Sequence, residues 1–175
     1  FIYGNAGFAA QDGIFLGTSA GFAIDTVHLK RVRIENCGRY GLRAVGAAVS
    51  STYIQRLHAE HSIMLNNVNC GISLTGACLE STFVNIFVIK NGGTAGTNAN
   101  CEFTLNSGSS NRVNIIGGGL NAFTGLNAGN PQTALKLEAV QQFNSIGVDY
   151  ESGDPMIDIS HSLTQNISIL GCNFG

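Results

Sequence analysis

The sequence predicts an all-β fold, a single-stranded parallel β-solenoid in which the chain coils about six times and stacks each strand on its equivalent in the next coil. An apolar pattern of the form h-x-x-h-x-h, where h is an apolar residue, recurs every 24 to 30 residues, and a shorter h-x-h pattern alternates with it. Helical periodicity is nearly absent, because Gly, Asn, Ser and Thr interrupt the chain every few residues. Two strand signatures per period indicate a coil that repeats along an axis.

The positions of both patterns define the expected coils. The first pattern begins at Leu29, Ile54, Val84, Val113, Phe143 and Ile167. The second pattern begins at Ile14, Leu42, Ile72, Phe103, Leu135 and Ile157. This register stacks Val84, Val113 and Phe143 on one another and places Ile116 in the core, so we expect Ile116→Asp to unfold the chain.

A column of amides follows the first apolar position. Asn85, Asn114 and Asn144 occupy it in three consecutive coils, which predicts a side-chain amide ladder along the stack. A leucine-rich repeat is the rival interpretation, since its spine has the same spacing with Asn or Cys three residues on. Cys37 and Asn121 fit that slot, whereas Ser62, Gly92 and Glu151 do not. The β-solenoid is therefore favoured.

Composition excludes several classes of protein. A chain of 175 residues suits one domain, taken as residues 1–175, and 44% apolar against 11% charged residues excludes disorder. A net charge of −2 gives no basis for nucleic-acid binding, and the lack of an 18-residue apolar run predicts no membrane insertion. The chain begins Phe1-Ile2-Tyr3, without Met or a signal peptide, so we expect a fragment of a longer chain.

The five cysteines are odd in number and contain no C-x-x-C pair. This spacing argues against a disulfide framework and against a zinc site, and predicts buried free thiols. We expect no metal and no other cofactor.

The amino-acid sequences of the coils resemble those of a known superfamily. Residues 27–38, 40–45 and 81–92 are similar to coils of the right-handed parallel β-helices of the pectate-lyase-like superfamily, above all the central domain of bacteriophage tailspikes and capsule depolymerases. The resemblance implies a homotrimer on the virion tail that binds, and cleaves as a glycosidase or lyase, a bacterial surface polysaccharide. It also implies folding in the reducing bacterial cytoplasm. A non-catalytic structural or adhesive segment and a cellular polysaccharide-degrading enzyme are the alternatives.

A basic stretch with two acids is the first candidate site. The predicted register sets Glu35 and Glu60 on adjacent coils, about 5 Å apart. Six of the nine Lys and Arg residues lie between positions 30 and 56, as an anionic polysaccharide would require. The neighbouring substrate-binding candidates are Arg31, Arg33, Arg56 and His58. Cross-strand salt bridges on a solvated face are the alternative interpretation.

The second candidate site is Asp149-Tyr150-Glu151, near Asp154 and Asp158. Two residues apart on a strand, Asp149 and Glu151 share a side at about 6.5 to 7 Å between Cα atoms, a separation suited to the acid and base of an inverting glycosidase. Tyr150 is expected to stack on a sugar ring. A polar loop without chemistry is the alternative.

Overall fold

The computed structural model describes residues 1–4, 11–18, 22–47, 52–92, 99–105, 111–122, 133–151 and 155–175, and every regular element among them is a β-strand. The first strands are β1 (Ile2–Tyr3), β2 (Ile14–Gly17), β3 (Ile24–Lys30), β4 (Arg33–Glu35), β5 (Tyr40–Gly46), β6 (Ile54–Glu60), β7 (Ile63–Leu65), β8 (Cys70–Gly76) and β9 (Glu80–Ile89). The remaining strands are β10 (Ala99–Leu105), β11 (Arg112–Asn121), β12 (Thr133–Glu138), β13 (Gln142–Ile146), β14 (Asp149–Glu151), β15 (Ile157–Asp158), β16 (Ile167–Leu170) and β17 (Asn173–Phe174). None of the described elements is a helix that could span a membrane.

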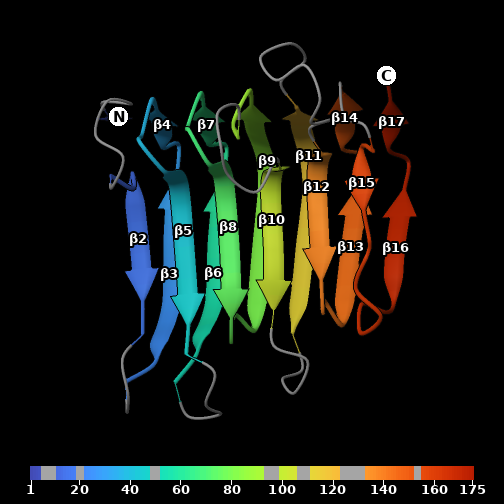
Figure 1. Cartoon of the computed structure of the whole chain (residues 1–175), viewed down its shortest axis with the longest axis horizontal. Helices are drawn as coiled ribbons and strands as arrows, with labels where there is room; N and C mark the ends of the chain where they lie inside the picture. Colours follow the sequence, from blue (N-terminus) through green and yellow to red (C-terminus); the bar gives the residue numbers. More distant parts are fainter. Residues whose placement is uncertain are drawn as a thin grey trace.

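The strands form a parallel β-solenoid, which confirms the predicted fold class. One sheet has six strands in the order β15-β12-β10-β8-β5-β2, and an eleven-stranded sheet follows the path β1-β4-β7-β9-β11-β13-β16 with β3, β6, β14 and β17 beside it. In Figure 1 the near strands run down and the far strands run up as the chain advances, which makes the coil right-handed. Four central turns have a neighbouring turn on each side, and shorter strands lie at each end of the stack. The number of complete turns is therefore about four, slightly fewer than the predicted six.

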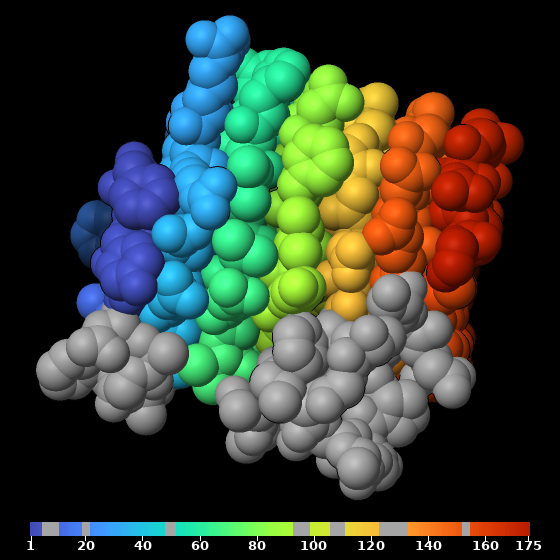
Figure 2. All heavy atoms as spheres, turned by 90° about the horizontal axis from the view of Figure 1, so that it is seen from above, coloured from blue at the N-terminus to red at the C-terminus, as the bar shows by residue number. Residues whose placement is uncertain are grey.

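Each turn has three faces. Face one is the six-stranded sheet, face two consists of β3, β6, β13, β16 and the first halves of β9 and β11, and face three consists of β1, β4, β7, β14, β17 and the second halves of β9 and β11. Figure 2 shows the turns as adjacent ridges in sequence order. The side chains that could act on a ligand are therefore arranged in columns that cross the strands.

A residue with positive φ makes the corner between faces two and three in each of six turns, and in the turn of β11 the next residue, Gly118, also has positive φ. The corner residues all have φ between 48° and 64°, and they are Arg31, His61, Asn85, Gly117, Gly147 and Gly171. A left-handed residue turns the chain sharply and resets the in-and-out alternation of the strand. The two x positions that precede the second h of the pattern are thus an outward residue and this corner.

The core confirms the form of the h-x-x-h-x-h pattern but corrects its register. The inward column that begins the pattern is Leu29, Ala59, Phe83, Ile115, Ser145 and Ile169. Of the six predicted starts, only Leu29 is correct. The predicted start is five residues early in the second coil, one residue late in the third, and two residues early in each of the last three coils. At inward positions occupied by small residues, such as Ala59 and Ser145, the apolar pattern is absent from the sequence. Apolar residues at outward positions produce the same pattern in the wrong register.

Two consequences of that register were predicted wrongly. Val113 stacks on Phe143 as predicted, but Val84 pairs with Ile116 and Ser81 pairs with Val113. Ile116 faces outward and is 39% exposed, so it is no core residue. The second pattern is in register in five coils, and in the fourth coil Cys101 takes the place predicted for Phe103.

The expected amide ladder exists in shorter form. Asn144 Nδ2 donates to Asn114 Oδ1 at 2.8 Å, and Asn114 Nδ2 donates to Thr82 Oγ1 at 3.3 Å, whereas Asn85 stands at the corner. A second ladder is buried in the turn after face three: Asn67 Nδ2 donates to Asn91 Oδ1 at 2.7 Å. The second ladder continues because Asn91 Nδ2 donates to Asn100 Oδ1, also at 2.7 Å.

The cysteines are free thiols, as predicted. Cys37, Cys70, Cys78 and Cys101 are buried and Cys172 is half-buried. Burial raises the pKa of each of the four buried thiols, to about 11 for Cys78. These residues therefore act as small apolar side chains in the core.

Candidate functional site

An open groove of about 480 Å³ crosses the strands of face two. Its walls come from four consecutive strands, β3, β6, β9 and β11, because outward residues of stacked strands line up side by side. The lining residues are His28, Arg56, Leu57, His58, Glu60, Glu80, Thr82, Arg112 and Asn114. Apart from Leu57, every lining side chain can donate or accept a hydrogen bond.

One column of outward residues runs through the middle of the groove. His28 pairs with His58 in register, and their rings lie 5.4 Å apart between centroids with a tilt of 41°. His58 pairs in turn with Thr82, and Thr82 with Asn114. The hydrogen bond from Asn114 to Thr82 fixes the orientation of that amide within the column.

Ion pairs hold two of the four charged side chains that line the groove, Glu60 and Arg56. Lys30 Nζ lies 2.7 Å from Glu60 Oε1, and Arg56 forms an ion pair with Asp25 on the neighbouring strand. The hydrogen bond from Lys30, with further help from His61 and His58, lowers the pKa of Glu60. Glu60 is therefore an ionised carboxylate near neutral pH, which makes it a poor general acid.

Two charged groups of the groove are not engaged in an ion pair within the described part of the chain. Arg112 Nε donates to Gln142 Oε1 at 2.8 Å, which draws the guanidinium toward β13. Glu80 is the register partner of Arg112 on the other side, yet the two form no ion pair. A ligand in the groove thus meets a guanidinium and a carboxylate on adjacent strands.

The groove contains three of the predicted substrate-binding residues and excludes others. Arg56, His58 and Glu60 line it. Arg33 and Glu35 lie on face three, where Arg33 Nη2 is 2.7 Å from Glu35 Oε2. The exposed residue Arg31 stands at the corner between faces two and three.

The predicted stacking of Glu35 on Glu60 is wrong. Glu35 pairs with Leu65 on β7, and Glu60 pairs with Lys30 on β3 and Val84 on β9. The error has the same origin as the register error in the core, since the corner residue was not recognised. Glu35 and Glu60 therefore cannot act together on one glycosidic bond.

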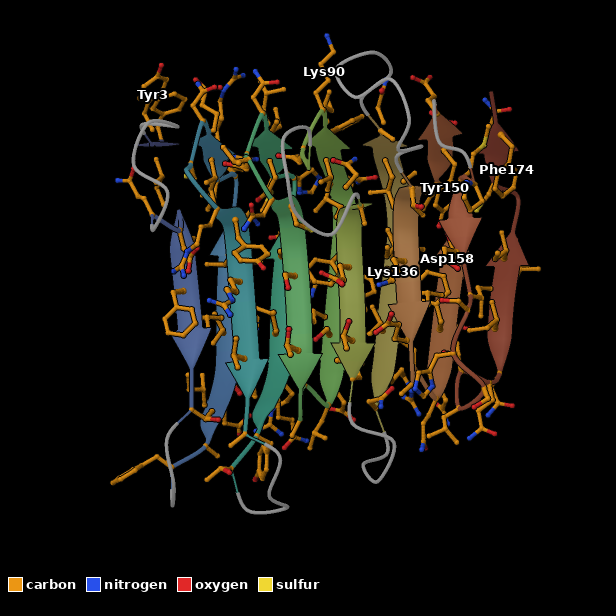
Figure 3. All side chains as sticks on the ribbon, in the orientation of Figure 1. Tyr3, Lys90, Lys136, Tyr150, Asp158 and Phe174 are labelled. Carbon is orange, nitrogen blue, oxygen red and sulfur yellow. The ribbon has the colours of Figure 1, made fainter. Side chains whose placement is uncertain are left out.

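The second candidate site lies on β14, away from the groove. Asp149 and Glu151 are exposed on one side of the strand, and Asn121 Nδ2 donates to Glu151 Oε2 at 2.6 Å. Neither carboxylate has a Lys or Arg within ion-pair distance among the residues that the structure describes. Asp154 falls outside the described residues, and Asp158 lies beside Lys136 on face one (Figure 3).

Tyr150 is not available to a sugar, which corrects its predicted role. Its side chain is fully buried, with the ring stacked on Phe174 at 5.2 Å and the hydroxyl 2.7 Å from Ser145 Oγ (Figure 3). Burial raises the pKa of Tyr150. Alternation along β14 explains this, because Asp149 and Glu151 point outward and the residue between them must point inward.

Sequence reasoning missed the five other polar residues of the groove: His28, Glu80, Thr82, Arg112 and Asn114. Part of the signal was present, since His28 and His58 are 30 residues apart and so are Arg112 and Gln142, a spacing equal to one coil. Glu80 and Thr82 could not be placed, because the coil that joins β6 to β9 is shorter than its neighbours. Among the described residues, no cluster of three or more His, Cys, Asp or Glu could hold a metal ion.

Comparison with known proteins identifies no family for this chain. No protein-family model, curated protein or solved structure matches it. The strand pairing alone therefore establishes the parallel β-solenoid, and the groove on face two is the starting point for its function.

Proposed function

We propose that this solenoid binds a bacterial surface polysaccharide in the groove of face two. The observation that supports the proposal is the unbroken row of polar side chains across four strands, spaced at about 4.8 Å per strand. A polysaccharide is a long ligand rich in hydroxyl groups, and it needs hydrogen-bonding groups repeated along a line rather than gathered in a deep pocket. The resemblance to tailspike and depolymerase coils points to the same class of ligand.

Binding to immobilised bacterial polysaccharides tests the proposal. Asn114→Ala removes the amide that ends the polar column of the groove on β11, and we expect it to weaken binding roughly three- to tenfold. Asn173→Ala is the matched control, because Asn173 is exposed on β17, distant from the lining residues. Equal affinities of the parent and Asn114→Ala for every polysaccharide bound would contradict the proposed site.

Cleavage is a second candidate function, proposed for Asp149 and Glu151. Both carboxylates are exposed and share one side of β14, with Cα atoms about 6.5 to 7 Å apart, which suits the acid and base of an inverting hydrolase. We expect Asp149→Asn and Glu151→Gln each to slow the release of reducing ends about a hundredfold or more. Unchanged rates in both variants would remove these residues from consideration, and absorbance from an unsaturated uronate would indicate a lyase.

We also propose a homotrimer on a virion tail that folds in the bacterial cytoplasm. Four buried free thiols suit a reducing compartment, and exposed Phe87 and Phe174 on face three are apolar enough for contact between subunits. A stable monomer of the intact parent protein in a solution mass measurement would contradict the trimer. Absence of the protein from purified virions would contradict the proposed location.

A further inference from the structure

Most cations of the basic stretch that pointed to an anionic ligand already have a carboxylate partner in the folded chain. Among the described residues, five of the six cations are paired, with Asp12 shared by two of them, and Arg31 is the exception. The ion pairs are Lys30 with Glu60, Arg33 with Glu35, Arg39 and Arg43 with Asp12, and Arg56 with Asp25. A polyanion that bound to these cations would have to replace carboxylates already in place.

Beyond Arg112, face two carries no formal charge on its described strands. β13 reads Gln-Phe-Asn-Ser-Ile and β16 reads Ile-Ser-Ile-Leu. The polar column of the groove continues there as Asn144 and Ser168, which are amide and hydroxyl groups. Asn144 Nδ2 donates to Asn114 Oδ1 at 2.8 Å, so the column outside the groove is ordered in the same way as the column within it.

An aliphatic row runs beside this polar column. It consists of Ile116, Ile146 and Leu170, which pair in register and are 39%, 43% and 57% exposed. A pyranose ring presents hydroxyl groups at its rim and C–H groups on its faces. Neighbouring columns of amides and aliphatic side chains match both parts of a neutral sugar, whereas neither column offers a cation to an acidic sugar.

We infer that the polysaccharide bound along face two is neutral, and that it extends from the groove over Asn144 and Ile146 toward β16. This inference depends on the proposed polysaccharide-binding function and specifies its ligand. A polyuronate presents a carboxylate on every sugar and needs an available cation at nearly every strand. On the described strands of face two, Arg112 is the one cation without a carboxylate partner, and the carboxylate of Glu80 on the next strand would repel such a ligand.

Salt dependence of binding distinguishes the two ligand classes. The whole chain is tested against purified neutral and acidic bacterial polysaccharides at about 50 mM and about 500 mM NaCl, a range over which exposed charges become screened. We expect binding to neutral polysaccharides, with a Kd that changes less than about twofold between the two salt concentrations. Arg112→Gln should leave that salt response unchanged, as should the distant exposed control Lys90→Gln.

Each other result has a definite meaning. One contrary result is binding to acidic polysaccharides alone, which salt weakens about tenfold or more in the parent and does not weaken in Arg112→Gln. That result would overturn the neutral ligand but keep the proposed function. Binding to neither class would overturn the proposed function and the inference with it.

Ile146→Gln should weaken binding of the neutral polysaccharide by roughly threefold or more. If Ile146→Gln instead changes the solution mass and leaves affinity unchanged, the aliphatic row is a subunit interface and the extended path is wrong.

Discussion

Replacing Asn91 by leucine tests how much the buried amide ladder stabilises the solenoid. Asn91 Oδ1 accepts from the backbone N–H of Asn67 at 2.9 Å and from Asn67 Nδ2 at 2.7 Å, and all of these groups are buried. Leucine has a similar size but no acceptor, so two buried donors would lose their partner. At about 1 to 3 kcal/mol for each unsatisfied donor, we expect the free energy of unfolding to fall by about 2 to 6 kcal/mol.

Chemical denaturation followed by circular dichroism measures this change, since the chain has no Trp to report by fluorescence. For a chain of this length the loss corresponds to a fall in Tm of roughly 4 to 24 °C. Asn173→Leu is the control, because Asn173 is exposed and its backbone N–H donates to the Val148 carbonyl in both forms. If Asn91→Leu costs less than about 1 kcal/mol, no more than the control, the ladder does not stabilise the fold.

Three further predictions follow from burial and backbone geometry. Ile115→Asp should prevent folding because Ile115 is fully buried, whereas Ile116→Asp should fold with nearly the parent Tm. An equal loss of stability in the two variants would contradict the register of β11. Gly118→Ala should cost more than Gly147→Ala in urea titrations, because a Cβ at Gly118 overlaps the carbonyl of the stacked strand while the space around Gly147 is open. Stability should fall as pH rises above about 9. Burial raises the pKa of Cys78 to about 11, so the thiol of the unfolded chain ionises at a lower pH than the thiol of the folded chain. Equal urea midpoints at about pH 7.5 and 10 would refute this.

The sequence predicted the repeat better than its register. The form h-x-x-h-x-h is correct, because a strand, a one-residue corner and a second strand repeat in each coil. Its placement failed where the inward residue is small, as at Ala59, or where an outward residue is large and apolar, as at Ile116. With the corrected register, the slot three residues after the pattern holds Cys37, Asn67 and Asn91, the column of the buried ladder.

The candidate site was predictable only in part for a related reason. Arg56, His58 and Glu60 were singled out because they lie in a basic stretch, and all three line the groove. The partners that define the groove come from β9 and β11, and their columns depend on coil lengths that differ from turn to turn. The ion pairs could not be predicted either, because the sequence does not show that Asp25 faces Arg56.

Stacking in parallel register gives the solenoid a modular way to change length. Each turn contacts the turn before it and the turn after it, and neighbouring residues in one column are 22 to 34 positions apart in the chain. Duplication or deletion of one complete coil would join strands that already occupy equivalent places, so the other turns would keep their neighbours. The length of the ligand-binding face could therefore change during evolution in steps of one strand spacing, about 4.8 Å, without redesign of the core.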